Sequence, residues 1–258
     1  MKKKINHQLE WETIIIYFIR VLFVIEFFVP VVLWLIHHTQ NIHTEVKFIN
    51  MFTAVLGLLL TFIPKAVEKI SKSRLKFSAT LSFAIIVFIF GAEFLGEIKK
   101  FYDIFPWWDV MLHTVSGVIL GLIGFMLVFV LNESTRTKVQ LSPLFICFFA
   151  FCFALSCGAI WEIFEFSGDR LLHMNMQKYL PPAGTTKLFT ANWRFDAGLI
   201  DTMTDIICDA SSAFVTSLFG YIALIIRAHK LGKKALVVVS EKEFMDALTQ
   251  GKNLHVKL

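Results

Sequence analysis

Charge is scarce in this sequence and unevenly distributed. Only 17% of the 258 residues are Asp, Glu, Lys or Arg, whereas 56% are hydrophobic and the mean hydropathy is +0.67. A soluble domain is nearer about 45–50% apolar, and the charged residues here lie between long apolar runs. The composition therefore excludes an ordinary soluble protein and indicates an integral membrane protein.

The surplus of positive charge does not indicate a nucleic-acid partner. The net charge is +5, but the lysines and arginines fall in the connections between apolar runs. In a membrane protein such residues meet the anionic headgroups on the cytoplasmic side. We therefore expect the lipid bilayer as a partner and no nucleic acid.

Motifs for disulfides and for signal cleavage are also missing. The four cysteines, Cys147, Cys152, Cys157 and Cys208, lie inside apolar runs, and no C-x-x-C occurs. They are interpreted as small buried hydrophobic side chains. The lysines near the start precede an apolar run that is too long for a signal peptide and lacks a small-residue cleavage site. That run is predicted to be an uncleaved first span.

The apolar runs predict six membrane spans. They cover residues of about 13–35, 48–63, 75–95, 108–131, 142–166 and 198–226. Each is near the ~20 residues that a bilayer requires, although the second is short and the sixth is long enough to tilt. The sequence thus predicts an all-α polytopic bundle in a single domain, 1–229, followed by a short cytoplasmic tail, 230–258.

The distribution of basic residues predicts the orientation. With the N-terminus inside, the cytoplasmic segments hold 17 Lys and Arg residues and the outer segments hold 7. The positive-inside rule then places both termini in the cytoplasm. It places the long connection 167–196 outside, either as a lid over a site or as a half-buried segment at the membrane interface.

The sixth span opens with three regularly spaced aspartates, Asp201, Asp205 and Asp209. Steps of four residues bring side chains back to one face of a helix. Carboxylates at membrane depth are costly, and ionisable residues in a span are functional candidates by default. We therefore expect this face to take part in a functional site or a buried polar network.

Other spans bring acidic residues to the same predicted leaflet. Asp109 and His113 share a face at the start of the fourth span, and Glu162 and Glu165 lie at the end of the fifth. Alternate spans run in opposite directions, so all four residues reach the outer side. Glu93 at the end of the third span is either a site member or an interface charge.

Simpler interpretations remain for several of these residues. Asp109 suits the start of a helix, where free N–H groups and the dipole favour a carboxylate. His113 has the alternative of a hydrogen bond to a neighbouring helix. Four further acidic residues are expected to be solvated loop charges: Glu97, Asp103, Asp169 and Asp196. Small residues from Ser116 to Gly124 predict close helix packing.

A dense group of carboxylates in a low dielectric must be protonated, paired with cations or bound to a metal. The candidate basic partners all lie outside the predicted spans; they are Arg170, Arg194, Lys99 and Lys100. Oxygen ligands with one histidine favour Mg²⁺, Mn²⁺ or Ca²⁺ over zinc. The predicted metal ligands are Asp109, His113, Glu162, Asp201, Asp205 and Asp209, with Glu165 as a catalytic base.

Three short patterns carry a resemblance to a known family. They are Asp109-x-x-x-His113-x-x-x-Gly117, Trp161-Glu162-x-x-Glu165 and Asp201-Thr202-Met203-x-Asp205. Together they resemble the YjdF-like bacterial inner-membrane proteins over about residues 90–220, and there is a weaker likeness to VanZ-like proteins. The resemblance implies a multi-pass protein of the bacterial cytoplasmic membrane and supplies no settled activity.

Three functions fit this sequence. The first is a lipid-modifying membrane enzyme with a metal-assisted site that opens to the outer leaflet. The second is a transporter that uses the same carboxylates for a small cation or for protons, although no inverted repeat is visible. The third is a non-catalytic scaffold in which the acidic network fixes helix packing. The oligomeric state is left open.

Overall fold

The computed structural model describes residues 2–39, 48–132, 141–180 and 196–231. Within these ranges every regular element is helical and no strand occurs, which confirms the all-α prediction. Of the predicted tail 230–258, residues from 232 onward lie outside the described residues. Residues 181–195 of the predicted outer connection also lie outside them.

The described helices include five that are long and apolar enough to cross a membrane. They are Glu10–Ile36, Ala79–Ile98, Trp108–Val130, Pro143–Leu171 and Ala197–Ile226. A sixth span is obtained if Asn50–Leu60 and Ile63–Ile70, which are bent by 46°, are counted together. The prediction of about six spans is confirmed, and the short second span is the broken one.

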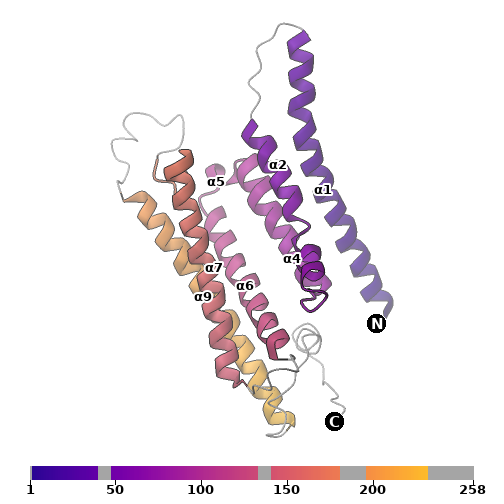
Figure 1. Ribbon diagram of the computed structural model, residues 1–258, viewed down its shortest axis with the longest axis vertical. Helices are drawn as coiled ribbons and strands as arrows, with labels where there is room; N and C mark the ends of the chain where they lie inside the picture. The colour runs from indigo at the N-terminus through magenta and orange to yellow at the C-terminus, as the bar shows by residue number, and fades with distance from the viewer. Residues whose placement is uncertain (1, 40–47, 133–140, 181–195, 232–258) are drawn as a thin grey trace. The chain divides into compact units, whose positions relative to one another are not determined.

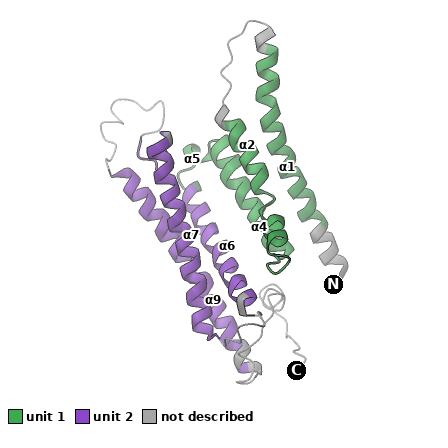
Figure 2. Ribbon diagram, in the orientation of Figure 1, with its two compact units in different colours: residues 1–108 green, residues 109–258 purple. Residues whose placement is uncertain are grey.

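The chain divides into two compact units, residues 1–108 and 109–258 (Figure 2). The first unit holds α1 (Lys2–Thr39), α2 (Phe48–Leu60), α3 (Ile63–Ile70), α4 (Ala79–Ile89), a π-helical segment η1 (Phe90–Ile98) and α5 (Phe101–Ile104). The second holds all but the first residue of α6 (Trp108–Asn132), together with α7 (Pro143–Leu172) and α9 (Ala197–Leu231) (Figure 1).

The first unit packs around a buried apolar cluster that includes Phe23, and two polar contacts also join its segments. Phe23 of α1 is fully buried and packs edge-to-face on Phe94, with ring centroids 5.6 Å apart. Arg20 donates to the side chain and the carbonyl of Thr61 at 3.0 and 3.1 Å, at the break between α2 and α3. Glu26 pairs with Lys99 at 2.8 Å. Arg20 therefore hydrogen-bonds neutral groups, and Glu26 forms an ion pair.

Several helix ends differ from the predicted spans for local reasons. α4 begins at Ala79, not near 75, because the Ser78 side chain accepts a hydrogen bond from the Leu81 N–H at 3.2 Å. α7 continues to Leu172, six residues beyond the predicted end, and stops where His173 adopts a left-handed backbone with φ 54°. Hydropathy marks the apolar part of a helix and misses its polar last turns.

The second unit has an apolar core and a polar end. The core combines late residues of α6 and α9 with early residues of α7: Phe125, Val128, Phe129, Ile146, Cys147, Ala150 and Leu224. α6 and α9 begin at the opposite end, and α7 ends there, so the acidic residues of all three helices meet at that end. Asp109 precedes Phe125 by a helical length of about 24 Å.

Glycines let α6 approach its two neighbours. A Cβ on Gly124 would lie 2.8 Å from the Ala150 Cα on α7, and a Cβ on Gly117 would lie 2.7 Å from the Asp209 carbonyl oxygen on α9. Both distances are shorter than real side-chain contacts, so larger residues would push the helices apart. The predicted close packing of this small-residue face is confirmed.

Candidate functional site

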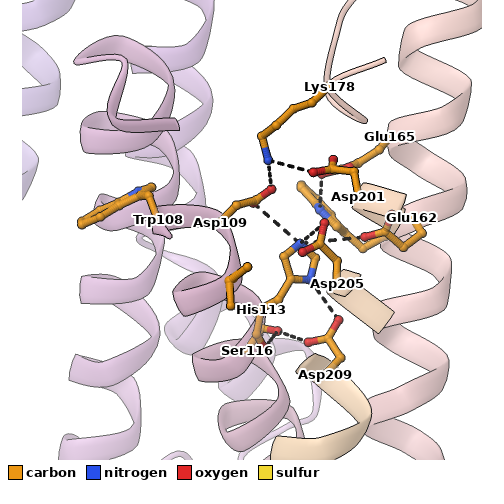
Figure 3. Close-up of polar contacts among 12 residues, drawn as sticks. Trp108, Asp109, His113, Ser116, Glu162, Glu165, Lys178, Asp201, Asp205 and Asp209 are labelled. Atoms are coloured by element: carbon orange, nitrogen blue, oxygen red, sulfur yellow. Dashed lines mark hydrogen bonds and ion pairs between the residues drawn. The ribbon is translucent and has the colours of Figure 1, made fainter. Parts of the chain in front are cut away.

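The acidic end of the second unit surrounds one histidine (Figure 3). His113 of α6 is 6% exposed, and the nearby carboxylates Glu162, Asp205 and Asp209 are 3%, 2% and 1% exposed. They come from α6, α7 and α9, whose polar residues recur at helical spacing on the faces turned toward one another. This arrangement places charged groups in a nearly water-free interior.

The Nε2 atom of His113 faces three carboxylates. It lies 3.9 Å from Asp109 Oδ1, 3.8 Å from Glu162 Oε1 and 3.9 Å from Asp205 Oδ2. These distances are too long for hydrogen bonds. They match ligand atoms that share an ion, because bonds of about 2.0–2.6 Å place such atoms about 3–5 Å apart. Ligand atoms of Asp109, His113 and Asp205 all lie within 4.8 Å of one another.

A second group shares the same histidine. Ligand atoms of His113, Glu162 and Glu165 also lie within 4.8 Å of one another. Glu165 is buried, and one of its oxygens accepts a hydrogen bond from Trp161 Nε1 at 2.9 Å. Glu165 therefore stands beside the carboxylate cluster with a fixed orientation.

The second ring nitrogen of His113, Nδ1, lies at hydrogen-bonding distance from a different carboxylate. His113 Nδ1 lies 3.0 Å from Asp209 Oδ2, which is hydrogen-bonding distance. The Ser116 hydroxyl lies one helical turn after His113, and its single proton faces two acceptors, Asp209 Oδ1 and the His113 carbonyl oxygen. Asp209 thus has a partner for each of its oxygens.

Several buried carboxylate oxygens have no such partner. Both oxygens of Glu162, Oδ2 of Asp205 and Oδ2 of Asp201 make no hydrogen bond that meets the usual geometry, although Thr202 lies near Glu162. Leaving a buried polar atom unpaired is costly, so such atoms call for an explanation, such as a bound ion.

One lysine enters the site from the segment after α7. The Lys178 ammonium pairs with Asp109, and it lies 3.2 Å from Asp201 Oδ1. Burial alone would lower the pKa of Lys178, but the charges of Asp109 and Asp201 raise that pKa above its ordinary value. Lys178 therefore carries its positive charge throughout the neutral range.

Residues 173–180, here called the strap, hold Lys178 in this position. The buried Asp169 carboxylate accepts hydrogen bonds from the N–H groups of Met176 at 2.7 Å and Gln177 at 2.9 Å. The Gln177 side chain donates to Thr202 on α9 at 2.7 Å. The expectation that Asp169 is a solvated loop charge is wrong, because α7 continues past it and the strap folds back over its side chain.

The structure brings most of the predicted ligands together. Asp109, Glu162, Asp205 and Asp209 each approach a ring nitrogen of His113 within 4 Å. Asp201 pairs with Lys178 instead. Among the expected loop charges, Asp103 is exposed. Glu93 lies in η1 of the first unit.

Sequence reasoning missed three residues that support the site. Ser116 follows His113 by three positions and Asp169 follows Glu165 by four, so helical spacing could have found both. Lys178 has no such signal, because its position depends on how the strap folds.

Comparison with known proteins identifies the family but supplies no activity. An "Uncharacterized protein" of Thermotoga maritima is 25% identical over 160 residues, which cover 62% of this chain and 70% of that protein. No solved structure matches the chain. The family described as "Predicted membrane protein (DUF2238)" matches residues 19–225, a range that includes every residue of the acidic cluster. The chain therefore belongs to this family of predicted membrane proteins.

Proposed function

We propose that this protein is a membrane enzyme that binds a divalent cation at His113 and acts on a lipid. The proposal rests on the buried carboxylate of Glu162. Its side chain is 3% exposed, neither of its oxygens makes a hydrogen bond of the usual geometry, and Oε1 lies 3.8 Å from His113 Nε2. A bound cation would satisfy these oxygens.

The charge balance also supports a cation. Asp109, Glu162, Glu165, Asp201, Asp205 and Asp209 lie at this end of the unit, and the basic groups that contact them are Lys178 and His113 (Figure 3). In a low dielectric such a set cannot remain fully ionised without further positive charge. A divalent ion would supply two charges where the carboxylates converge.

The donor set favours a hard ion. Asp109, His113, Glu162 and Asp205 would hold it, and Asp201 could join once Lys178 is displaced. Carboxylate oxygens with one imidazole suit Mn²⁺, Mg²⁺ or Ca²⁺ better than zinc. When bound, such an ion supplies a Lewis acid or an activated water. Glu165, beside the cluster and oriented by Trp161, would accept a proton as general base.

The position of the cluster favours an enzyme over a transporter. It lies at the beginnings of α6 and α9 and near the end of α7, whereas transporter sites lie near the bilayer midplane between broken helices. α6, α7 and α9 run unbroken through the site. Transport by the same residues remains the alternative.

A lipid substrate is supported by the surroundings of the acidic end. Ile163 and Phe164 on α7 and Leu199 on α9 are 64%, 58% and 65% exposed, and each lies within two positions of an acidic residue of the site. Apolar side chains this exposed fit contact with acyl chains. The excess of basic residues in the other connections would place this end at the outer leaflet. The YjdF-like resemblance supports the bacterial cytoplasmic membrane as the location.

Metal binding is tested on detergent-purified protein stripped with EDTA and reloaded with Mn²⁺. We expect about one ion per chain by elemental analysis. We also expect a higher unfolding temperature, because a ligand at 100 times its Kd stabilises by about 2.7 kcal/mol. Glu162→Gln should reduce both, while Glu10→Gln, an exposed acid on α1, should change neither. Wild-type protein that binds no ion and is unaffected by EDTA would rule out the cation site.

The enzymatic role is tested in proteoliposomes of mixed phospholipids. We expect lipid products, detected by mass spectrometry, that require both protein and Mn²⁺. Glu165→Gln should slow their formation by about 100-fold or more, since a general base contributes about 10²–10⁴-fold, and it should retain bound metal. Accumulation of Mn²⁺ inside the vesicles without any lipid change would favour transport instead.

Replacing Lys178 should strengthen Mn²⁺ binding, whereas replacing Glu162 should weaken it. Its ammonium occupies Asp109 and Asp201, so it competes with an added cation for these carboxylates. Lys178→Met should therefore bind Mn²⁺ tighter by about tenfold, a difference of about 1.4 kcal/mol, as measured by titration calorimetry. Lys178→Arg, which keeps the charge, serves as the control. Weaker binding by Lys178→Met would show that Lys178 assists the ion and does not compete with it.

A further inference from the structure

Asp209 differs from the other buried acids of the cluster in how its oxygens are used. Oδ2 lies 3.0 Å from His113 Nδ1, and Oδ1 receives the Ser116 hydroxyl. Glu162 and Asp205, in contrast, retain oxygens without partners. Asp209 is therefore already satisfied within the protein, whereas the other two have lone pairs available.

The two sides of the imidazole ring point in different directions. An ionised carboxylate can only accept hydrogen bonds, so opposite an ionised Asp209 the proton of the shared hydrogen bond lies on Nδ1. Nε2, on the far side of the ring, is left facing Asp109, Glu162 and Asp205 at 3.8–3.9 Å. An ion bound to Nε2 would be separated from Asp209 by the whole ring. That is well beyond a metal–oxygen bond of about 2.0–2.6 Å.

Two glycines fix where the Asp209 carboxylate lies. A Cβ on Gly117 of α6 would lie 2.7 Å from the Asp209 carbonyl oxygen, and a Cβ on Gly158 of α7 would lie 3.0 Å from its carboxylate carbon. Both helices thus come close to Asp209 where they carry no side chain. The carboxylate has little room to turn from Nδ1 toward the Nε2 side.

From this geometry we propose that Asp209 is a positioning residue and not a metal ligand. It holds the Nδ1–H of His113, with Ser116 as its support, so that Nε2 points at Asp109, Glu162 and Asp205. This revises its predicted role as a ligand. In metal proteins, a carboxylate behind a ligating histidine fixes the ring and tunes its affinity for the ion. The consequence for metal affinity rests on the proposed function, whereas the hydrogen bond does not.

The test compares Asp209→Ala with Asp205→Ala in two measurements. Nitrogen NMR of metal-free, ¹⁵N-histidine-labelled protein should show a protonated Nδ1 on His113, assigned by its loss in His113→Gln. Asp209→Ala should abolish this fixed protonation and Asp205→Ala should keep it. For Mn²⁺, Asp209→Ala should keep about one ion per chain with about 10–100-fold weaker affinity, whereas Asp205→Ala should lose stoichiometric binding.

Two milder variants cover the case in which Asp209→Ala does not fold. Asp209→Asn keeps an acceptor oxygen and should preserve the Nδ1–H signal, while Ser116→Ala should weaken Mn²⁺ binding without abolishing it. An unchanged His113 spectrum in Asp209→Ala would overturn the proposal. If Asp209→Ala does not fold, loss of the Nδ1–H signal in Asp209→Asn would overturn it. Wild-type protein that shows the Nδ1–H signal but binds no Mn²⁺ would refute the cation site and leave the positioning role standing.

Discussion

The cost of burying negative charge governs the acidic end of the second unit. Carboxylates from α6, α7 and α9 lie within a few ångströms of one imidazole, and three of them are at most 3% exposed. In low dielectric each uncompensated charge costs several kcal/mol. The contacts at this end are therefore best understood by how each one neutralises, orients or shares that charge.

The compensation has distinct parts. Asp209 hydrogen-bonds His113 and Ser116, while Lys178 pairs with Asp109 and with Oδ1 of Asp201. Glu162 and Asp205 keep buried oxygens that make no hydrogen bond of the usual geometry near Nε2 of His113, and Asp201 Oδ2 is a further buried oxygen without such a bond. The apolar core lies at the other end of the same three helices, so the packing that holds the helices together is separate from the groups that would bind an ion. Glycines on α6 serve both ends of the unit, because they let α6 approach α7 near the apolar core and α9 near the acidic residues.

Helical spacing accounts for what could be predicted from the sequence. A step of four residues placed Asp205 with Asp209 and Asp109 with His113, and the alternating direction of the spans brought them to one end. The same rule would have included Asp169 had α7 been extended past residue 166. The strap could not be foreseen, because Lys178 reaches the site through backbone hydrogen bonds and a left-handed residue that leave no periodic signal.

The central claim is that His113 provides a single nitrogen ligand among carboxylates. Electron–nuclear double resonance on Mn²⁺-loaded protein with ¹⁵N-labelled histidine tests this directly, since the sequence holds eight histidines and only a coordinated ring gives a large coupling. The account predicts one strongly coupled ¹⁵N nucleus, which His113→Gln removes. Bound Mn²⁺ with no coupled nitrogen, or a coupling that survives in His113→Gln, would contradict it.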